Sequence, residues 1–192
     1  MSRGKLIVVS APSGAGKTTI VKALLTKYPS MLFSVSATTR PKREIEIDGR
    51  DYFFLQREDF ERRIAAGELV EWEQIYENLY GTLKSEVDKA LSSGKTMLFD
   101  IDVKGGLSIK RMYPSDSVII FIKPPSIEIL RDRLLNRKTE DEGTFKRRMD
   151  RVAMELGMAS QFDYQVVNDS LDKAIAEVDQ LVIEHTSEKQ RV

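Results

Sequence analysis

The residues whose types and spacing best suit chemistry stand near the start of the 192-residue chain. Residues 11–18 read Ala-Pro-Ser-Gly-Ala-Gly-Lys-Thr and match the phosphate-loop pattern G-x-x-x-x-G-K-[ST], except that Ala11 replaces the first glycine. In such a loop several backbone N–H groups converge at a helix N-terminus, where the helix dipole also attracts an anion. We therefore expect Lys17 to reach the β- and γ-phosphates of a nucleotide and the Thr18 hydroxyl to join a Mg²⁺ shell. The predicted triphosphate-binding residues of this loop are Ala11, Pro12, Ser13, Gly14, Ala15, Gly16, Lys17, Thr18 and Thr19.

A second Gly-Lys-Thr tripeptide shows that context decides this assignment. Gly94-Lys95-Thr96 follows a helical pattern and precedes a predicted strand, so its N–H groups would not converge on an anion. Lys89 also occupies the position of the first glycine. The tripeptide at 16–18 instead follows a predicted strand and opens a predicted helix. We therefore assign the phosphate loop to residues 11–18, where the alternative is an ordinary strand-to-helix turn.

Charged residues elsewhere could complete such a site. Residues 34–43, Ser-Val-Ser-Ala-Thr-Thr-Arg-Pro-Lys-Arg, are too polar for a core, and a solvated basic turn is their simplest interpretation. Asp100 and Asp102 lie at the C-terminal end of a predicted parallel strand, where open α/β sheets bind ligands. Arg133 and Arg137 share one face of a predicted helix, although arginines on helices are usually solvated.

The elements that must position these residues alternate between strand and helix. Four short apolar runs lack a polar face and each precedes a helical stretch: Leu6–Ser10, Thr96–Ile101, Ser117–Ile122 and Tyr164–Val167. Strands of this kind, alternating with helices, favour a central parallel sheet covered on both faces. The chain is therefore predicted to have an α/β fold. A last helix, carrying Leu171, Ile175, Val178 and Val182, should pack on the sheet, with residues 188–192 frayed.

Two regions interrupt this alternation. Residues 36–91 suggest an α+β insertion, with a polar turn at 40–50, a strand at 52–55, a helix at 57–66 and an extended stretch at 69–76. Residues 126–160 suggest two helices around a loose polar tip at 138–143. In the second of these helices Phe145, Met149, Val152 and Leu156 form one apolar stripe. This helical hairpin is an element that can close over a site.

Composition narrows the class of protein. Hydrophobic residues make up 41% of the chain and charged residues 31%, which is typical of a globular protein with a packed core. Thirty basic residues balance thirty acidic ones, which argues against a broad nucleic-acid surface. The absence of cysteine excludes disulfides and thiolate sites, and His185 stands in a polar stretch that suggests no catalytic role. No apolar run is long enough for a secretory segment or a membrane span, so we expect a cytoplasmic protein with no membrane partner.

Six ordered motifs resemble the guanylate kinase family in its bacterial form. They are the phosphate loop, Ser-Val-Ser-Ala-Thr-Thr-Arg-Pro-Lys-Arg at 34–43, Gly-Arg-Asp-Tyr at 49–52, Val-Glu-Trp at 70–72, Tyr-Gly-Thr at 80–82 and Leu-Phe-Asp-Ile-Asp at 98–102. The resemblance spans about residues 5–185. It implies a P-loop nucleoside-monophosphate kinase that moves the γ-phosphoryl of ATP·Mg²⁺ to GMP or dGMP. It also implies a core domain (1–35, 93–125 and 161–192), a GMP-binding domain (36–92) and a lid (126–160).

The resemblance also implies roles for individual residues. Arg40, Arg43, Tyr52 and Tyr80, with Ser36, would hold the acceptor phosphate, because arginine offers paired donors to phosphate and tyrosine adds neutral ones. The GMP-binding set is completed by Glu71, Thr82, Asp100 and Asp102, and which aspartate serves the metal and which the guanine stays open. Arg133 would bind ATP beside the phosphate loop. The implied catalytic residues, all cations near the transferred phosphoryl group, are Lys17, Arg43, Arg137 and Arg148.

Glu71 is the residue predicted to read the base. Guanine presents N1–H and its exocyclic amine as adjacent donors, so one carboxylate accepts both while the Thr82 hydroxyl donates to O6. Adenine inverts this pattern, and a site built on such bonds can reject the wrong base by roughly 10⁴-fold. For Glu73 we prefer the solvated face of a strand.

Two other functions remain open from sequence alone. Guanylate-kinase-like domains also serve as peptide-recognition modules, whose expected signature is a degraded phosphate loop or lost lid arginines. A kinase for another small acceptor is the second alternative, against which Glu71 and Thr82 argue. The oligomeric state, the donor preference and the adenine contacts are not predicted, and Asn168-Asp169 could touch the donor base or serve in a turn or as a helix cap.

Overall fold

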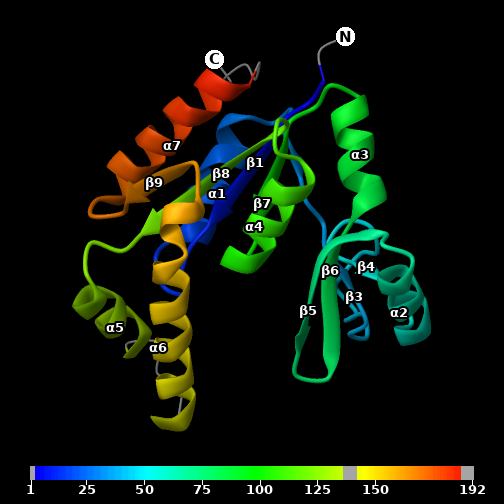
Figure 1. Ribbon diagram of the computed structural model, residues 1–192, viewed down its shortest axis with the longest axis horizontal. Coiled ribbons are helices and arrows are strands. Elements are labelled where there is room, and N and C mark those ends of the chain that lie inside the picture. Colours follow the sequence, from blue (N-terminus) through cyan, green and yellow to red (C-terminus); the bar gives the residue numbers. More distant parts are fainter. Residues whose placement is uncertain (1–2, 136–141, 187–192) are drawn as a thin grey trace.

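A five-stranded parallel sheet forms the centre of the molecule. The computed structural model describes residues 3–135 and 142–186, and their side chains except those of 133–135 and 142–147. The strands lie in the order β2-β7-β1-β8-β9, and every pair is parallel (Figure 1). Their bounds are β1 Leu6–Ser10, β2 Leu32–Phe33, β7 Met97–Asp100, β8 Ser117–Lys123 and β9 Tyr164–Val167. The four predicted buried strands are confirmed to within one residue at each end.

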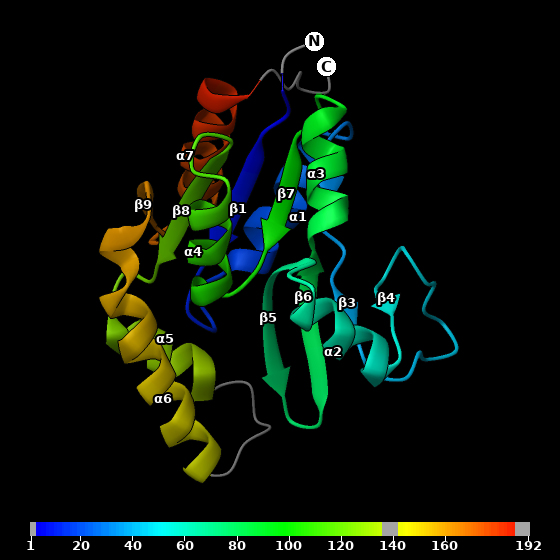
Figure 2. The same ribbon diagram turned by 45° about the vertical axis from the view of Figure 1, so that its right-hand side comes forward.

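Helices cover both faces of this sheet. Successive side chains of a strand point to opposite faces, so Ile7 and Val9 of β1 lie in one apolar cluster and Leu6 and Val8 in the other. The first cluster packs against α1 and α7, and the second against α3 and α4 (Figures 1 and 2). These helices are α1 Lys17–Lys27, α3 Lys84–Ser92, α4 Val103–Met112 and α7 Leu171–His185. The prediction of a parallel sheet covered on both sides is therefore confirmed.

The insertion between β2 and α3 carries a sheet of its own. Its strand order is β4-β3-β6-β5, with β3 parallel to β4 and antiparallel to β6, and β5 antiparallel to β6. A small core of its own includes Phe60, Leu69 and Leu79. The elements are β3 Ala37–Thr38, β4 Phe53–Phe54, α2 Arg57–Ala65, β5 Leu69–Ile75 and β6 Asn78–Leu83.

Sequence reasoning missed the strands β2, β3 and β6. The first two have only two residues each, too few for an alternating pattern to be recognised. β6 contains Gly81, a residue that weakens the strand signal. A β-carbon at Gly81 would lie 2.7 Å from the Glu71 backbone oxygen, so the close approach of β5 and β6 requires glycine there.

A helical arm of two helices projects beside the C-terminal end of the central sheet. We use this name for α5 (Ile127–Leu135) and α6 (Glu142–Gly157), which figures 1 and 2 place across from the β5–β6 hairpin. The predicted pair of helices is confirmed, whereas the polar tip lies largely outside the described residues, as does the predicted frayed end at 188–192. None of the described helices is both long and apolar enough to cross a bilayer.

Candidate active site

The phosphate loop connects β1 to α1 as the sequence predicts. Gly14 and Gly16 have φ values of 89° and 98°, a backbone conformation that residues other than glycine rarely adopt. Ala11 does not have a positive φ, so alanine fits in place of the first glycine of the pattern. No side chain caps α1 and its first turn holds no acidic residue. The helix N-terminus therefore remains able to attract an anion.

Asn168 holds the phosphate loop in place through a hydrogen bond to its backbone. Its buried side-chain amide donates to the Ala15 backbone oxygen at 2.7 Å. A β-carbon on Gly16 would lie 2.3 Å from that amide nitrogen, so the glycine also makes room for Asn168. The sequence left open whether Asn168 contacts a donor base or serves in a turn or as a helix cap, and this bond gives it a structural role in the phosphate loop instead.

Asp100 faces the start of α1. Its carboxylate pairs with Lys17 Nζ and accepts from the Thr18 hydroxyl at 3.2 Å. Lys17 Nζ also donates to the Ile101 backbone oxygen at 3.0 Å. The described residues contain no group of three or more histidine or acidic side chains that could hold a metal alone. Hydroxyl and carboxylate oxygens side by side are nevertheless the donors that Mg²⁺ takes when phosphates supply the rest, so Thr18 and Asp100 fit this ion.

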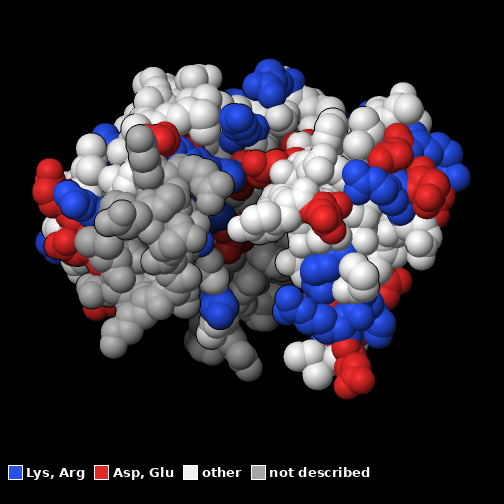
Figure 3. All heavy atoms as spheres, turned by 90° about the horizontal axis from the view of Figure 1, so that it is seen from below, with Lys and Arg blue, Asp and Glu red and all other residues white. Residues whose placement is uncertain are grey.

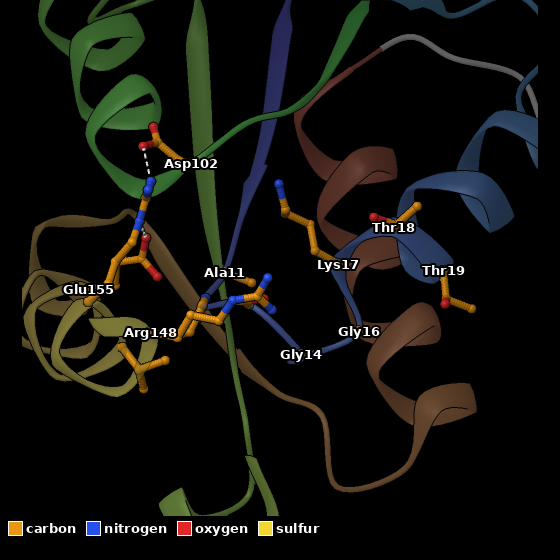
Figure 4. Close-up of a pocket in the computed structure, with 13 residues that line it drawn as sticks. Ala11, Gly14, Gly16, Lys17, Thr18, Thr19, Asp102, Arg148 and Glu155 are labelled. Carbon is orange, nitrogen blue, oxygen red and sulfur yellow. Dashed lines mark hydrogen bonds and ion pairs between the residues drawn. The ribbon is translucent and has the colours of Figure 1, made fainter. Parts of the chain in front are cut away.

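A pocket of about 480 Å³ lies over the phosphate loop, and we call it the loop pocket. One wall is the loop with Lys17, Thr18 and Thr19, and the other is Asp102 with residues of α6. In Figure 4 the Arg148 side chain extends from α6 toward the loop, across from Lys17. Cations thus face the loop pocket from two separate elements. Its α6 wall consists of Arg148, Arg151, Val152 and Glu155.

Three of the predicted acceptor-phosphate residues, Arg40, Tyr52 and Tyr80, lie together beside the second sheet. Arg40 lies over the Tyr52 ring at 5.4 Å, and Tyr52 meets Tyr80 edge to face at 6.1 Å. Arg40 Nη2 donates to Glu46 Oε1 at 2.6 Å, and that bond, helped by Tyr80, raises the pKa of Arg40. Arg43 is exposed, and its backbone N–H donates to the other Glu46 oxygen at 2.8 Å. Sequence reasoning missed Glu46, because only the fold reveals that it pairs with Arg40.

Glu71 and Thr82 are brought together across β5 and β6. Leu69 pairs with Leu83 and Glu71 with Thr82, so Val70 is the extra residue of a β-bulge. The bulge lets Val70 pack into a core cluster of the central sheet while Glu71 meets the buried Thr82 hydroxyl, which donates to Glu71 Oε1 at 2.6 Å. Burial raises the pKa of Glu71 to about 7; nearby Asp102 adds to the rise and the Thr82 bond opposes it.

A second pocket, of about 430 Å³, lies beside this carboxylate, and we call it the β5 pocket. It is lined by β5 residues and by the first turns of α4. Asp102 lines both pockets, and its Oδ1 caps α4 by accepting from the Gly105 backbone N–H at 2.8 Å. The two pockets therefore meet at Asp102, while Asp100 belongs to the phosphate-loop side. The side chains lining the β5 pocket include Glu71, Trp72, Glu73 and Lys104.

Not every predicted residue can be placed in this way. The side chains of Arg133 and Arg137 lie outside the described residues, so their predicted roles stay predictions. Ser36 is partly buried, and its backbone oxygen accepts from the Phe53 N–H. Glu73, predicted to be solvated, is 41% exposed yet pairs with Arg151 of α6 at 3.4 Å.

Seen from below, acidic and basic side chains are interspersed around the central hollow (Figure 3).

Arg151 and Glu155 are two further site residues that, like Glu46, the sequence did not reveal. They are four residues apart on α6, and Arg151 Nε donates to Glu155 Oε1 at 2.9 Å. Glu155 is only 6% exposed at its side chain, and burial raises its pKa above the ordinary value. A charge inside the predicted apolar stripe of α6 is a signal that could have been noticed: residue 155 directly precedes Leu156.

Comparisons with known proteins match this architecture over almost the whole chain. A family model described as guanylate kinase matches residues 3–185. A guanylate kinase of Chlorobium luteolum is 46% identical over 187 residues, which is 97% of this chain and 95% of that protein. One of Salinibacter ruber is 50% identical over 173 residues, 90% of this chain and 92% of that protein. The crystal structure of guanylate kinase from Anaplasma phagocytophilum aligns with a TM-score of 0.72 at 29% identity, covering 97% of this chain and 88% of that one.

The fold, the phosphate loop and these matches define a P-loop enzyme of the nucleoside-monophosphate kinase class, which confirms the predicted fold class. The extent of the family model and the identity to curated relatives then settle the family. The chain belongs to the guanylate kinase family, as its motifs suggested.

Proposed function

We propose that the chain transfers the γ-phosphoryl group of ATP to GMP or dGMP, giving ADP and GDP or dGDP. One observation carries the proposal: the pocket over the phosphate loop and the pocket beside Glu71 meet at Asp102. Two nucleotides bound there would point their phosphates toward each other. Phosphoryl transfer depends mainly on such positioning and on cations that neutralise the phosphate oxygens. The names of the relatives support the same reaction.

The donor side would work through charge rather than through a base. Lys17 would leave Asp100 for the β- and γ-phosphates, and Arg148 would approach the transferred group from α6. Thr18 and Asp100 would hold Mg²⁺, which when bound would neutralise phosphate charge. This arrangement favours Asp100 for the metal and Asp102 for the guanine amine. Arg133 and Arg137 keep the roles implied by the family resemblance, beside ATP and the transferred phosphoryl group respectively.

The acceptor side would bind phosphate and base at separate points. Arg40, with Tyr52 and Tyr80, would take the GMP phosphate in exchange for Glu46, and Arg43 and Ser36 would complete this group. Glu71 would accept from guanine N1–H and the exocyclic amine. The Thr82 hydroxyl, which donates to Glu71 in the ligand-free protein, would turn to guanine O6.

Closure of the proposed domains would complete the site. We propose residues 1–35, 93–125 and 161–192 as the core, 36–92 as the GMP-binding domain and 126–160 as the lid. Motion of the lid and of the GMP-binding domain toward the core would bring the cations to the phosphates and expel water that would otherwise hydrolyse ATP.

The peptide-recognition alternative is less well supported. Such a module has no need for a phosphate loop with a free helix N-terminus, or for Lys17 and Arg148 on opposite walls of one pocket. The kinase of a different acceptor is disfavoured by Glu71 and Thr82, which present guanine with its complementary acceptor and donor.

A coupled assay of ADP release tests the proposed function directly. ATP·Mg²⁺ is supplied with GMP, dGMP, AMP, CMP or UMP as acceptor. We expect turnover with GMP and dGMP, and at least about a thousandfold lower kcat/KM with the other three, because none of their bases presents the two adjacent N–H donors that Glu71 would accept. Comparable turnover with AMP, or none with any acceptor, would contradict the proposal.

Acidic pH should weaken GMP binding. The ionised Glu71 carboxylate is the form that accepts two guanine N–H groups, and the pKa of Glu71 in the free protein is about 7. Lowering the pH from about 8 to about 6 reduces the ionised fraction roughly tenfold, so the KM for GMP should rise by about that factor. The GMP phosphate also titrates, near a pKa of about 6. KM–pH profiles of the wild type and Glu71→Gln isolate the carboxylate, and identical profiles would refute its role.

A further inference from the structure

Arg151 joins three parts of the chain that are distant in sequence. From α6, its Nη2 donates to Asp102 Oδ2 at 2.8 Å and its Nη1 lies 3.4 Å from Glu73 Oε1 on β5. Its Nε donates to Glu155 Oε1 at 2.9 Å. The three guanidinium nitrogens thus each meet a different carboxylate, an arrangement that the planar arginine fork allows and a lysine ammonium does not reproduce.

Arg151 lies where the loop pocket and the β5 pocket adjoin. Asp102 is the residue at which the loop pocket and the β5 pocket meet, and Arg151 lines the loop pocket while Glu73 lines the β5 pocket. The Gly105 N–H holds one Asp102 oxygen and Arg151 holds the other, so the carboxylate is fixed on both sides. Of the described ion pairs, those of Arg151 with Asp102 and Glu73 are the ones that connect α6 to the wall around Glu71.

We propose that Arg151 is a positioning residue that couples the helical arm to the acceptor subsite. A bound acceptor that orders Asp102 and β5 would, through Arg151, also restrain α6, before ATP arrives. This inference rests on the proposed function, because it takes GMP to be the acceptor. It assigns Arg151 no contact with the transferred group, which distinguishes it from Arg148.

Kinetics separate this role from donor binding. In Arg151→Met, a change that keeps an unbranched apolar stem but removes the guanidinium fork, we expect the KM for GMP to rise about tenfold and the KM for ATP to stay within about twofold. Arg151→Lys should recover only part of the loss. Arg62→Met is the matched control, because Arg62 is 71% exposed and pairs with Asp59 on the same helix. It should behave as the wild type.

A double-mutant cycle tests the link itself. If Arg151 acts through Glu73, then Glu73→Gln added to Arg151→Met should raise the KM for GMP little beyond Arg151→Met alone. Fully additive effects of the two changes would show that the pair at 3.4 Å transmits nothing, and would overturn the part of the coupling that runs through β5.

Amide hydrogen exchange gives a readout that needs no turnover. GMP alone should slow exchange of the α6 amides at 148–157 in the wild type and in Arg62→Met, but not in Arg151→Met. Equal protection in all three proteins would overturn the proposal, and so would an equal rise of both KM values, which would place Arg151 on the donor phosphates. A wild type that binds GMP but does not phosphorylate it would refute the proposed function, while the exchange comparison would still decide the role of Arg151.

Discussion

Lys17→Met is expected to yield a folded protein with no measurable phosphoryl transfer, a loss of at least about 10³-fold in kcat. The lysine is the cation at the start of α1 that faces the loop pocket, and no other residue of the loop can neutralise the charge on the β- and γ-phosphates. Its ammonium is held near Asp100 and the Ile101 oxygen, so it stands ready beside the loop before a nucleotide binds.

The chain provides its own control for this variant. Lys95 belongs to the second Gly-Lys-Thr tripeptide, and it is exposed between α3 and β7, away from both pockets. Lys95→Met should therefore keep wild-type turnover in the coupled assay. Thermal melts of both variants check that they fold. Retained activity in a folded Lys17→Met protein would remove the phosphate loop from the mechanism.

Glu71→Gln should have the second largest effect, lowering kcat/KM for GMP by about 10³-fold while leaving ATP binding nearly unchanged. The glutamine amide would present a donor to the guanine N–H groups, and one polar group on each side would stay unpaired. We propose that ATP binds at the loop pocket, which Glu71 does not line, so the affinity for ATP should stay nearly unchanged.

Steady-state kinetics with GMP and AMP measure this change in preference. The GMP-over-AMP ratio of kcat/KM should collapse in Glu71→Gln, mainly through the loss for GMP. Glu77→Gln is the matched control, since Glu77 is exposed at the turn of the same β5–β6 hairpin. GMP kinetics unaltered by Glu71→Gln would mean that another group reads the base.

Patterns local in the sequence predicted four of the five strands of the central sheet and the phosphate loop. A buried strand such as Leu6–Ser10 and the glycines at 14 and 16 are determined by their immediate neighbours, so their types and spacing were sufficient. The second sheet was only partly predicted. Its register depends on the bulge at Val70 and on the close approach at Gly81, and both arise from pairing between strands rather than from either strand alone.

The candidate site was likewise predicted only in part. Lys17, Glu71 and Asp102 were named from motifs, and the fold brings all three to the walls of two adjoining pockets. Arg151 carries no motif, and its carboxylate partners include residues 49 and 78 positions away in the chain. Long-range ion pairs of this kind depend on how the helical arm packs against the insertion, which no local pattern encodes.

The central claim is that one protein molecule holds two nucleotides end to end, the donor phosphates on the amides near Lys17 and the acceptor base at Glu71. A ligand in which adenosine and guanosine are joined through a chain of phosphates tests this claim most directly. We expect it to bind much more tightly than ATP or GMP alone, because the second contact becomes intramolecular, and to lose this advantage in either Lys17→Met or Glu71→Gln. A crystal structure of the complex should place the phosphates on the loop and the guanine against Glu71. Affinity no better than that of ATP, with the guanine remote from Glu71, would contradict the account.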